Sequence, residues 1–398
     1  MSLFASIEEA PRDPILGLNE LFNADPNPEK INLGVGVYFN DEGKLPLLEC
    51  VDNAEKTIIA AHKPHAYQPI QGSDSYCNAV KQLLFGEDAE LLQRVVTVQS
   101  LGGTGGLKVG ADFLKRFYPQ SSVVISDPSW ENHRALFESA GFSVGTYAYY
   151  DAETHDVNFS GMLSALSALA AQSIVVLHAC CHNPTGIDLS IEQWKQVVEV
   201  CKARQLIPFL DMAYQGFASD VETDAAVVRL FAHSGLSLLI SNSFSKSFSL
   251  YGERVGALSI VTANKNEAAH VLSQVKRVIR TNYSNPPIHG GAIVSMILSS
   301  PELRAMWEKE LGDMRRRIQL MRQELVSKLN PLSPALDFSF INHQQGMFSY
   351  SGLNAEQARR LKADHGVYIL PTGRICIAAL NTRNIDAVVK AIGSVLDD

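Results

Sequence analysis

The feature that most constrains the fold of this chain is an alternation of short apolar runs with amphipathic segments, which begins near residue 94. The runs carry no polar face, which is typical of strands buried on both sides. Segments of helical periodicity, such as residues 191–205, separate them. This order predicts an α/β fold with a mostly parallel central sheet flanked by helices. The predicted strands span residues 95–98, 123–125, 174–177, 207–210 and 238–240.

The C-terminal part of the chain follows a different pattern. Apolar residues at spacings of three and four predict one long helix over residues 301–330. The later segments predict a smaller α/β domain, to which we expect the N-terminal residues to return. At 398 residues the chain is long enough for both parts. The later pieces are predicted strands at 337–341, 346–352 and 374–380 and helices at 355–365 and 384–396.

Charge and hydropathy exclude several classes of partner. The formal net charge of -8 argues against nucleic acid, because nucleic-acid-binding proteins usually present a basic face. The first residues, "MSLFASIEEAPRDP", lack the basic and then apolar pattern of an export signal. No uninterrupted apolar run approaches the length that spans a bilayer. We therefore expect a cytoplasmic protein that binds neither nucleic acid nor membrane.

The cysteines favour reduced thiols over disulfides or metal ligands. Six cysteines are scattered without a C-x-x-C pair. The stretch "HACCH" at residues 178–182 could suggest zinc, but adjacent cysteines with no second ligand pair lack the usual zinc spacing. We predict no metal site.

Polar stretches follow four of the predicted strands. They read "QSLGGTGGLK", "HACCHNPTG", "DMAYQG" and "SNSFSK". Each alone could be an ordinary turn or helix cap. Ligands of open α/β sheets bind at the carboxyl ends of the strands, so the four stretches together predict a ligand-binding cleft.

The glycine cluster that follows the first predicted strand is not a dinucleotide fingerprint. Gly103 and Gly105 are followed by Lys108 where G-x-G-x-x-G requires its third glycine, and no Gly-Lys-Ser/Thr ending is present. The missing fingerprint argues against a nucleotide-dependent oxidoreductase. Free backbone N–H groups at a helix start, together with the Thr104 hydroxyl, still predict a phosphate seat.

Four other residues at the strand ends suggest the ligand. Asp211 directly follows an apolar run, where a charge is costly unless it meets a cation or a strong donor. Tyr214 and Asn183 could add a phenol and an amide to the same cleft. Burial of Lys246 would lower the pKa of its amine and free it to form a Schiff base. A phosphate seat, a carboxylate, a phenol and an amine together point to pyridoxal 5'-phosphate.

Ordered motifs carry a resemblance to a known family. The stretches "NPTG" at residues 183–186, "DMAY" at 211–214 and "SFSK" at 243–246, followed by Arg254, resemble the motifs of class I aminotransferases in order and spacing. The likeness to the aspartate and aromatic-amino-acid aminotransferase branch runs from "DPILGLNELFNAD" to "TGRICIAALN". It implies the pyridoxal-phosphate-dependent fold type I and a homodimer with shared active sites. It implies a large cofactor-binding domain over residues 46–312 and a small domain from residues 1–45 and 313–398.

The resemblance also implies catalytic roles. Lys246 is similar to the lysine that forms the Schiff base and then moves a proton between the substrate Cα and C4′ of the cofactor. Asp211 resembles the partner of the pyridine nitrogen, with His133 and His178 beside it. Tyr214 resembles the residue that hydrogen-bonds the phenolic oxygen of the cofactor.

Further cofactor and substrate contacts follow from the same resemblance. Asn183 matches a second residue at the phenolic oxygen, and Trp130 matches the aromatic residue that stacks on the ring. Tyr67 matches a residue that reaches the phosphate from the other subunit. The residues that match the phosphate cup are Gly103, Thr104, Ser243 and Arg254.

Two arginines are implied to bind the substrate. Arg374 resembles the arginine that grips the α-carboxylate, a bidentate task suited to a guanidinium group. Arg280 resembles the arginine that reaches over from the partner subunit to bind a second carboxylate. Gly36 lies in the loop that is implied to close over the substrate, which Trp130 and Asn183 also contact.

The substrate pattern of the sequence is mixed. Phe39, Leu45 and Ala66 are apolar where the aspartate-selective branch has polar residues, which favours aromatic substrates. Other positions resemble the aspartate-selective type: Val37, Thr104 and Asn285. We expect an enzyme that moves the amino group of Tyr, Phe, Trp and aspartate to 2-oxoglutarate by a ping-pong mechanism. The alternatives are an aspartate aminotransferase with little aromatic activity, and a related decarboxylase, eliminase or non-catalytic binding protein.

Overall fold

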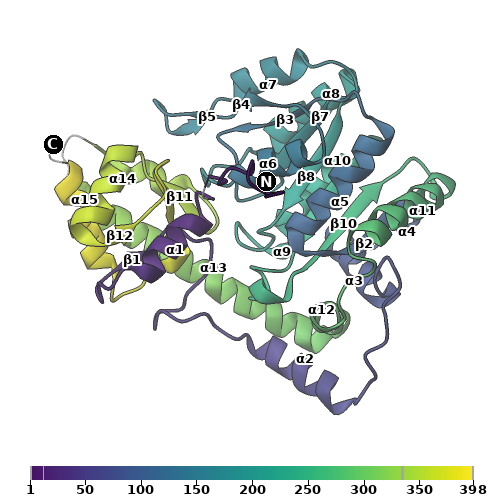
Figure 1. The fold of residues 1–398 in the computed structure, drawn as a ribbon, viewed down its shortest axis with the longest axis horizontal. Helices are drawn as coiled ribbons and strands as arrows, with labels where there is room; N and C mark the ends of the chain where they lie inside the picture. Colours follow the sequence, from purple (N-terminus) through teal and green to yellow (C-terminus); the bar gives the residue numbers. More distant parts are fainter. Residues whose placement is uncertain (1, 12, 333–335, 397–398) are drawn as a thin grey trace.

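The computed structural model describes residues 2–11, 13–332 and 336–396 (Figure 1). Its centre is a seven-stranded sheet. The strands lie in the order β2 (Val95–Leu101), β10 (Val255–Val261), β9 (Leu238–Ser243), β8 (Ile207–Met212), β7 (Ile174–His178), β3 (Val123–Asp127) and β4 (Val144–Ala148).

The sheet is mostly parallel, as the sequence predicts. Strand β10 runs antiparallel to both of its neighbours, β2 and β9, and the other strand pairs are parallel. All five predicted strands are present, and the α/β fold class is confirmed. Strands β4 and β10 were not predicted.

Helices cover both faces of the sheet, and each face has its own apolar core. Phe209 and Leu239 belong to one core, and Leu210 and Ile240, the next residues along the same strands, belong to the other. This alternation follows from the two-residue period of a strand. The first core includes residues of α5 (Gly102–Phe117), α6 (Glu131–Ser139) and α11 (Lys265–Asn282). The second includes residues of α3 (Asp74–Phe85), α7 (Phe159–Ser167), α8 (Ile191–Ala203), α10 (Ala226–His233) and α12 (His289–Ser299).

Helix α13 (Pro301–Leu329) connects the region of the large sheet to a smaller group of elements (Figure 1). The Ser300 hydroxyl accepts a hydrogen bond from the Leu303 amide, and Pro301 occupies the first helical turn, so the sequence fixes where the helix begins. The long helix predicted over residues 301–330 is confirmed.

The smaller group of elements combines the two ends of the chain (Figure 1). Strand β1 (Ile31–Asn32) pairs in parallel with β12 (Val367–Tyr368), and β11 (Phe348–Tyr350) pairs antiparallel with β13 (Arg374–Cys376). The predicted strand at residues 337–341 is wrong, because a 3-10 helix, η3 (Phe338–His343), occupies that segment. The helices here are α1 (Leu16–Ala24), α14 (Ala355–His365) and α15 (Ile385–Leu396).

The remaining elements are short or peripheral. They are α2 (Glu49–Ala60), α4 (Ala89–Gln93), α9 (Val221–Asp224), β5 (Tyr150–Asp151), β6 (Asp156–Val157), η1 (Tyr251–Glu253), η2 (Asn330–Leu332) and η4 (Ile377–Ala379). All six cysteines are buried and free, as expected from their spacing. Within the described ranges, no helix is both long enough and apolar enough to cross a bilayer.

Candidate active site

A cavity of about 560 Å³ collects most of the predicted site residues. It lies where β7, β8 and β9 end, which is the place that the sheet topology favours for a ligand. Twelve predicted residues line it: Gly36, Gly103, Thr104, Trp130, His178, Asn183, Asp211, Tyr214, Ser243, Lys246, Arg254 and Arg374.

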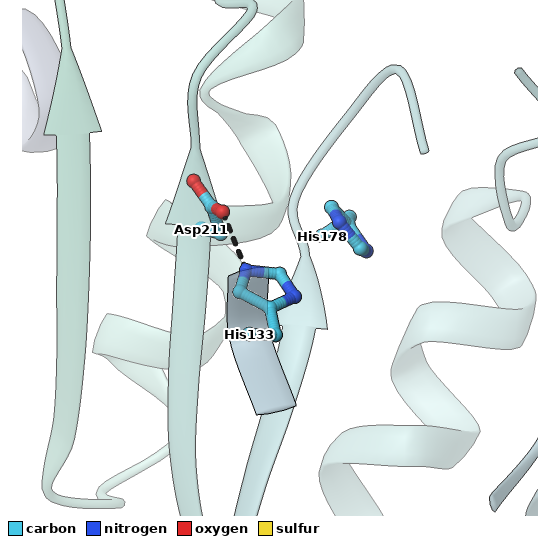
Figure 2. A group of neighbouring side chains, drawn as sticks. All are labelled: His133, His178 and Asp211. Atoms are coloured by element: carbon cyan, nitrogen blue, oxygen red, sulfur yellow. Dashed lines mark hydrogen bonds and ion pairs between the residues drawn. The ribbon is translucent and has the colours of Figure 1, made fainter. Parts of the chain in front are cut away.

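Asp211 lies at the end of β8, and the register of the sheet places polar residues on both sides of it. His178 of β7 and Ser241 of β9 are its strand partners. Figure 2 shows His133 approaching Asp211 from a helix while His178 projects from the neighbouring strand. His133 Nε2 is 2.8 Å from Asp211 Oδ2, and Ser129 Oγ is 3.0 Å from His133 Nδ1.

The surroundings of Asp211 keep it ionised. Burial alone would raise the pKa of this carboxyl group, but the hydrogen bond from His133 and the nearby His133, His178 and Lys246 outweigh burial and lower the pKa. The result is a carboxylate that is itself almost inaccessible to water. Burial, and then the neighbouring His133, lower the pKa of His178 to about 3, so this imidazole is neutral at physiological pH.

The Lys246 amine has an unusually low affinity for its proton. Desolvation lowers its pKa to about 8, although Asp211 acts in the opposite direction. Arg254 and Arg374 add to the lowering through charge repulsion. Lys246 Nζ lies 5.1 Å from the ring centre of Tyr214. A substantial fraction of this amine is therefore neutral and nucleophilic near pH 8.

Arg374 is held rigidly in the cavity wall. Its Nη1 donates to Asn183 Oδ1 at 3.0 Å, and its Nη2 donates to the Gly34 carbonyl oxygen at 2.6 Å. Its guanidinium carbon lies 4.1 Å from the ring centre of Phe348. The buried Nε finds no hydrogen-bond partner among the described residues. Arg374 thus retains donor capacity for an anion.

The residues predicted from the glycine cluster to form a phosphate seat lie at the start of α5. Gly102, with a φ of +68°, directly follows the last residue of β2 and is the first residue of α5. A Cβ atom on Gly102 would lie 2.6 Å from Arg254 Nη2, so only glycine lets this arginine approach. Gly103 lies close to Ser243, with 3.1 Å between an added Cβ and the serine Cβ. Backbone N–H groups, hydroxyls and a guanidinium group therefore converge here.

Tyr67 and Arg280 are not part of this cavity. The Tyr67 side chain is 92% exposed, and Arg280 lies in the last turn of α11, where its Nη1 donates to Ser284 Oγ. The resemblance implies that both residues act in the site of a partner subunit. Their roles stay predictions.

The cavity also contains residues that neither the sequence pattern nor the family resemblance had indicated. Phe348 of β11 supports Arg374, and Glu131, at the start of α6, has a buried Oε2 without a partner among the described residues. Neither residue belongs to a sequence motif, and a phenylalanine in a short apolar strand cannot be distinguished by sequence from a residue of the hydrophobic core. The other lining residues that were not predicted are Asp13, Ile15, Leu16, Leu107, Asn132, Ala213, Ser245 and Tyr251.

His133, His178 and Asp211 could also hold a cation. One potential ligand atom of each lies within 4.8 Å of the others. His133 and Asp211 already satisfy each other through their hydrogen bond, so a metal ion would have to replace it.

Comparison with known proteins agrees with this arrangement. The family model described as "Aminotransferase class I and II" matches residues 28–392. An aspartate aminotransferase of Pseudomonas aeruginosa is 63% identical over the full length of both chains. The aromatic-amino-acid aminotransferase of Escherichia coli is 49% identical over 99% of this chain and 100% of the relative.

A solved structure shows the same fold. The aromatic-amino-acid aminotransferase of Burkholderia pseudomallei, covalently bound to pyridoxal phosphate, is 63% identical and superimposes with a TM-score of 0.97 over the full length of both chains. The family model covers most of the sequence, and the relatives are aligned from end to end. The chain therefore belongs to the class I and II aminotransferases.

Proposed function

We propose that this aminotransferase uses pyridoxal 5'-phosphate to transfer the amino group of aromatic amino acids and of aspartate to 2-oxoglutarate in a ping-pong reaction. The observation that carries the proposal is the content of one cavity. It holds an amine with a pKa near 8 on Lys246, a carboxylate kept charged on Asp211, and a rigid arginine with a free donor, Arg374.

The residues of the cavity fit this cofactor. Neither ring nitrogen of the buried His178 has a hydrogen-bond partner among the described residues, and Arg374 Nε has none, so the site holds polar atoms that a bound polar group could satisfy directly or through water. Asp211 would hold the ring nitrogen, Tyr214 and Asn183 the phenolic oxygen, and Trp130 the ring face. The phosphate would lie against Gly103, Thr104, Ser243 and Arg254. When bound, the cofactor supplies a conjugated ring that takes up the electron pair released at the substrate Cα.

The protein residues would then divide the remaining tasks. Lys246 Nζ, with its lowered pKa, accepts the proton from the substrate Cα and later returns a proton. Burial raises the pKa of Tyr214, so its phenol remains protonated and able to donate a hydrogen bond. Arg374 binds the α-carboxylate and orients the Cα–H bond.

Apolar residues at the cavity favour an aromatic substrate. Ile15 and Leu16 line the cavity beside Trp130 and Phe348. Leu16 is 62% exposed, so a substrate ring that covers it would bury apolar surface. The residues that first suggested an aromatic preference, Phe39, Leu45 and Ala66, are not among those that line the cavity.

An aspartate aminotransferase with little aromatic activity is the second candidate. Two relatives that are each 63% identical to this chain carry different names, one aspartate and one aromatic-amino-acid aminotransferase. Thr104, which resembles the aspartate-selective type, lines the cavity. Both candidates require the same residues for the proton transfer.

The two candidates can be separated with the purified protein. The visible absorption of the bound cofactor is recorded, and phenylalanine or aspartate is then added alone, without a keto acid. We expect both amino acids to convert the absorption, with a higher second-order rate constant for phenylalanine. Conversion by aspartate only would establish the second candidate, and no cofactor absorption after added pyridoxal phosphate would overturn the site. The Lys246→Ala variant serves as the unreactive control.

We also propose that two copies of the chain assemble with shared active sites. The exposed positions of Tyr67 and Arg280, outside the cavity of their own chain, support this arrangement. The same proposal assigns residues 46–312 to a large domain and residues 1–45 and 313–398 to a small one. Sedimentation analysis that finds only monomers would contradict the shared sites.

A further inference from the structure

A second cavity, of about 380 Å³, lies apart from the candidate active site. Its walls are one face of α13, the loop at residues 217–219 after β8, and the segment 342–346 that precedes β11. None of its lining residues lines the first cavity. Among the described residues that form its walls there is no aspartate and no glutamate, but there are two arginines, Arg315 and Arg322.

Arg322 is a buried cation without a counterion. Arg322 is only 3% exposed, and its side chain forms no ion pair with any described residue. Its Nη2 donates to the carbonyl oxygens of Gly346 at 2.6 Å and Phe348 at 3.3 Å, and its Nε donates to Ser349 Oγ at 3.2 Å. These acceptors are neutral. Desolvation lowers the pKa of Arg322 to about 10, but it remains charged at neutral pH.

Arg315 brings a second positive charge to the same cavity. It lies seven residues before Arg322, which is about two helical turns, so both side chains leave α13 on the same face. Arg315 Nη1 donates to the Gly216 carbonyl oxygen at 2.8 Å. Asp220 interacts electrostatically with Arg315, but its carboxylate already accepts hydrogen bonds from the backbone N–H groups of Glu222 and Thr223 and from the Thr223 hydroxyl.

The other polar side chains of the cavity suit an oxyanion. Gln319, one turn after Arg315, and Gln345 contribute amide groups, and His343 contributes an imidazole. Guanidinium groups bind the oxygens of phosphates and carboxylates through paired N–H donors, which a monatomic ion such as chloride cannot engage in the same way. Arg315 and Arg322 form no ion pair with any described residue, and their two positive charges favour a doubly charged ligand.

We propose that this cavity is a binding site for a small oxyanion of charge about minus two, such as inorganic phosphate, held by Arg315 and Arg322. Binding would supply the countercharge that the protein itself does not provide for Arg322. Because Arg322 also holds the carbonyl groups of Gly346 and Phe348, the bound anion would stabilise the junction between α13 and β11.

The test is calorimetric titration of the holoenzyme with inorganic phosphate, at an ionic strength held constant with sodium chloride. In the holoenzyme the phosphate of the cofactor occupies the seat of the first cavity, which removes that seat as a competing site. We expect saturable binding to the wild-type protein. Arg315→Gln should weaken the phosphate affinity about tenfold or more, because it removes one charged donor.

Two further variants make the result specific. Arg316→Gln removes the same charge from an exposed neighbour that pairs with Asp313 and does not line the cavity, so it should bind phosphate like the wild type. Gln319→Glu adds a negative charge at an exposed position of the cavity wall and should abolish binding without a change in the core. Equal phosphate affinity in the wild type, Arg315→Gln and Gln319→Glu would overturn the proposal. So would an equal loss in Arg315→Gln and Arg316→Gln.

Discussion

His133 Nε2 and Asp211 Oδ2 lie 2.8 Å apart, and both side chains are almost inaccessible to solvent. A buried carboxylate is unfavourable unless it is paired. The hydrogen bond from His133 and the nearby charge of Lys246 act against the effect of burial, and the pKa of Asp211 is lowered. The pair therefore keeps a negative charge at the end of β8, where the proposed cofactor would need it.

Replacing Asp211 with asparagine should remove that charge while it preserves the size of the side chain. We expect kcat/KM for aspartate to fall by about a hundredfold or more. The variant lacks the carboxylate proposed to pair with the ring nitrogen of the cofactor, and loss of one partner of a buried charge pair costs several kcal/mol. Steady-state kinetics and the cofactor dissociation constant measure the effect. Asp112→Asn, which removes a partly exposed carboxylate paired with Lys108, is the matched control. Near-normal kinetics in Asp211→Asn would remove the proposed role.

Lys246 gives a prediction for pH dependence. Its pKa of about 8 lies below the ordinary value of 10.5, so the neutral amine becomes the major form as the pH rises through 8. In cofactor-free protein, the rate of covalent capture of added pyridoxal phosphate should therefore increase about tenfold per pH unit below pH 8 and level off above it. Stopped-flow absorbance measures this rate, with Lys246→Ala as the blank. A rate that keeps rising to pH 10 would show an ordinary lysine.

The environment of Arg374 predicts an effect shared by all substrates. Arg374→Lys keeps the positive charge but removes the planar guanidinium group. In the wild-type chain that group donates to Asn183 and Gly34 and still has an unpaired Nε. We expect kcat/KM to fall by about 10- to 100-fold for phenylalanine and aspartate alike, since both present an α-carboxylate. Arg316→Lys, at an exposed position of α13, should change neither. A loss confined to aspartate would place Arg374 at the side chain of the substrate.

The sequence allowed the sheet to be predicted better than the site. Runs such as residues 207–210 are apolar on both faces, so their burial could be inferred without any long-range information. The contact between Arg374 and Asn183 joins residues 191 positions apart, and spacing alone cannot predict it. Only the resemblance to a family suggested that these residues share a site. Phe348 and Glu131 were missed because their roles depend on neighbours that the tertiary fold brings to them.

The proposed position of Arg280 in the site of the partner subunit predicts that two defective variants restore activity when they form a mixed dimer. If Arg280 serves the site of the partner, a dimer of Lys246→Ala with Arg280→Ala contains one site with both residues intact. Refolding an equal mixture should restore aspartate turnover to about a quarter of the wild-type level, since half of the dimers would be mixed and each would hold one intact site. Arg280→Ala alone should lose far more activity with aspartate than with phenylalanine. Absence of any recovery in folded, dimeric mixtures would place Arg280 outside the partner's site.

The close contact between Gly110 of α5 and Phe209 of β8 gives a prediction about the packing of the helix that carries the proposed phosphate seat. A Cβ atom on Gly110 would lie 2.5 Å from Phe209 Cζ, in the core beneath the sheet. Gly110→Ala should therefore reduce the free energy of unfolding by about 1–3 kcal/mol through overpacking. Gly252→Ala is the control, because an added Cβ there would meet no atom within 4 Å. Chemical denaturation of both variants measures the difference. Equal stabilities would mean that α5 can move away from β8, and the position of Gly103 and Thr104 would then not depend on this contact.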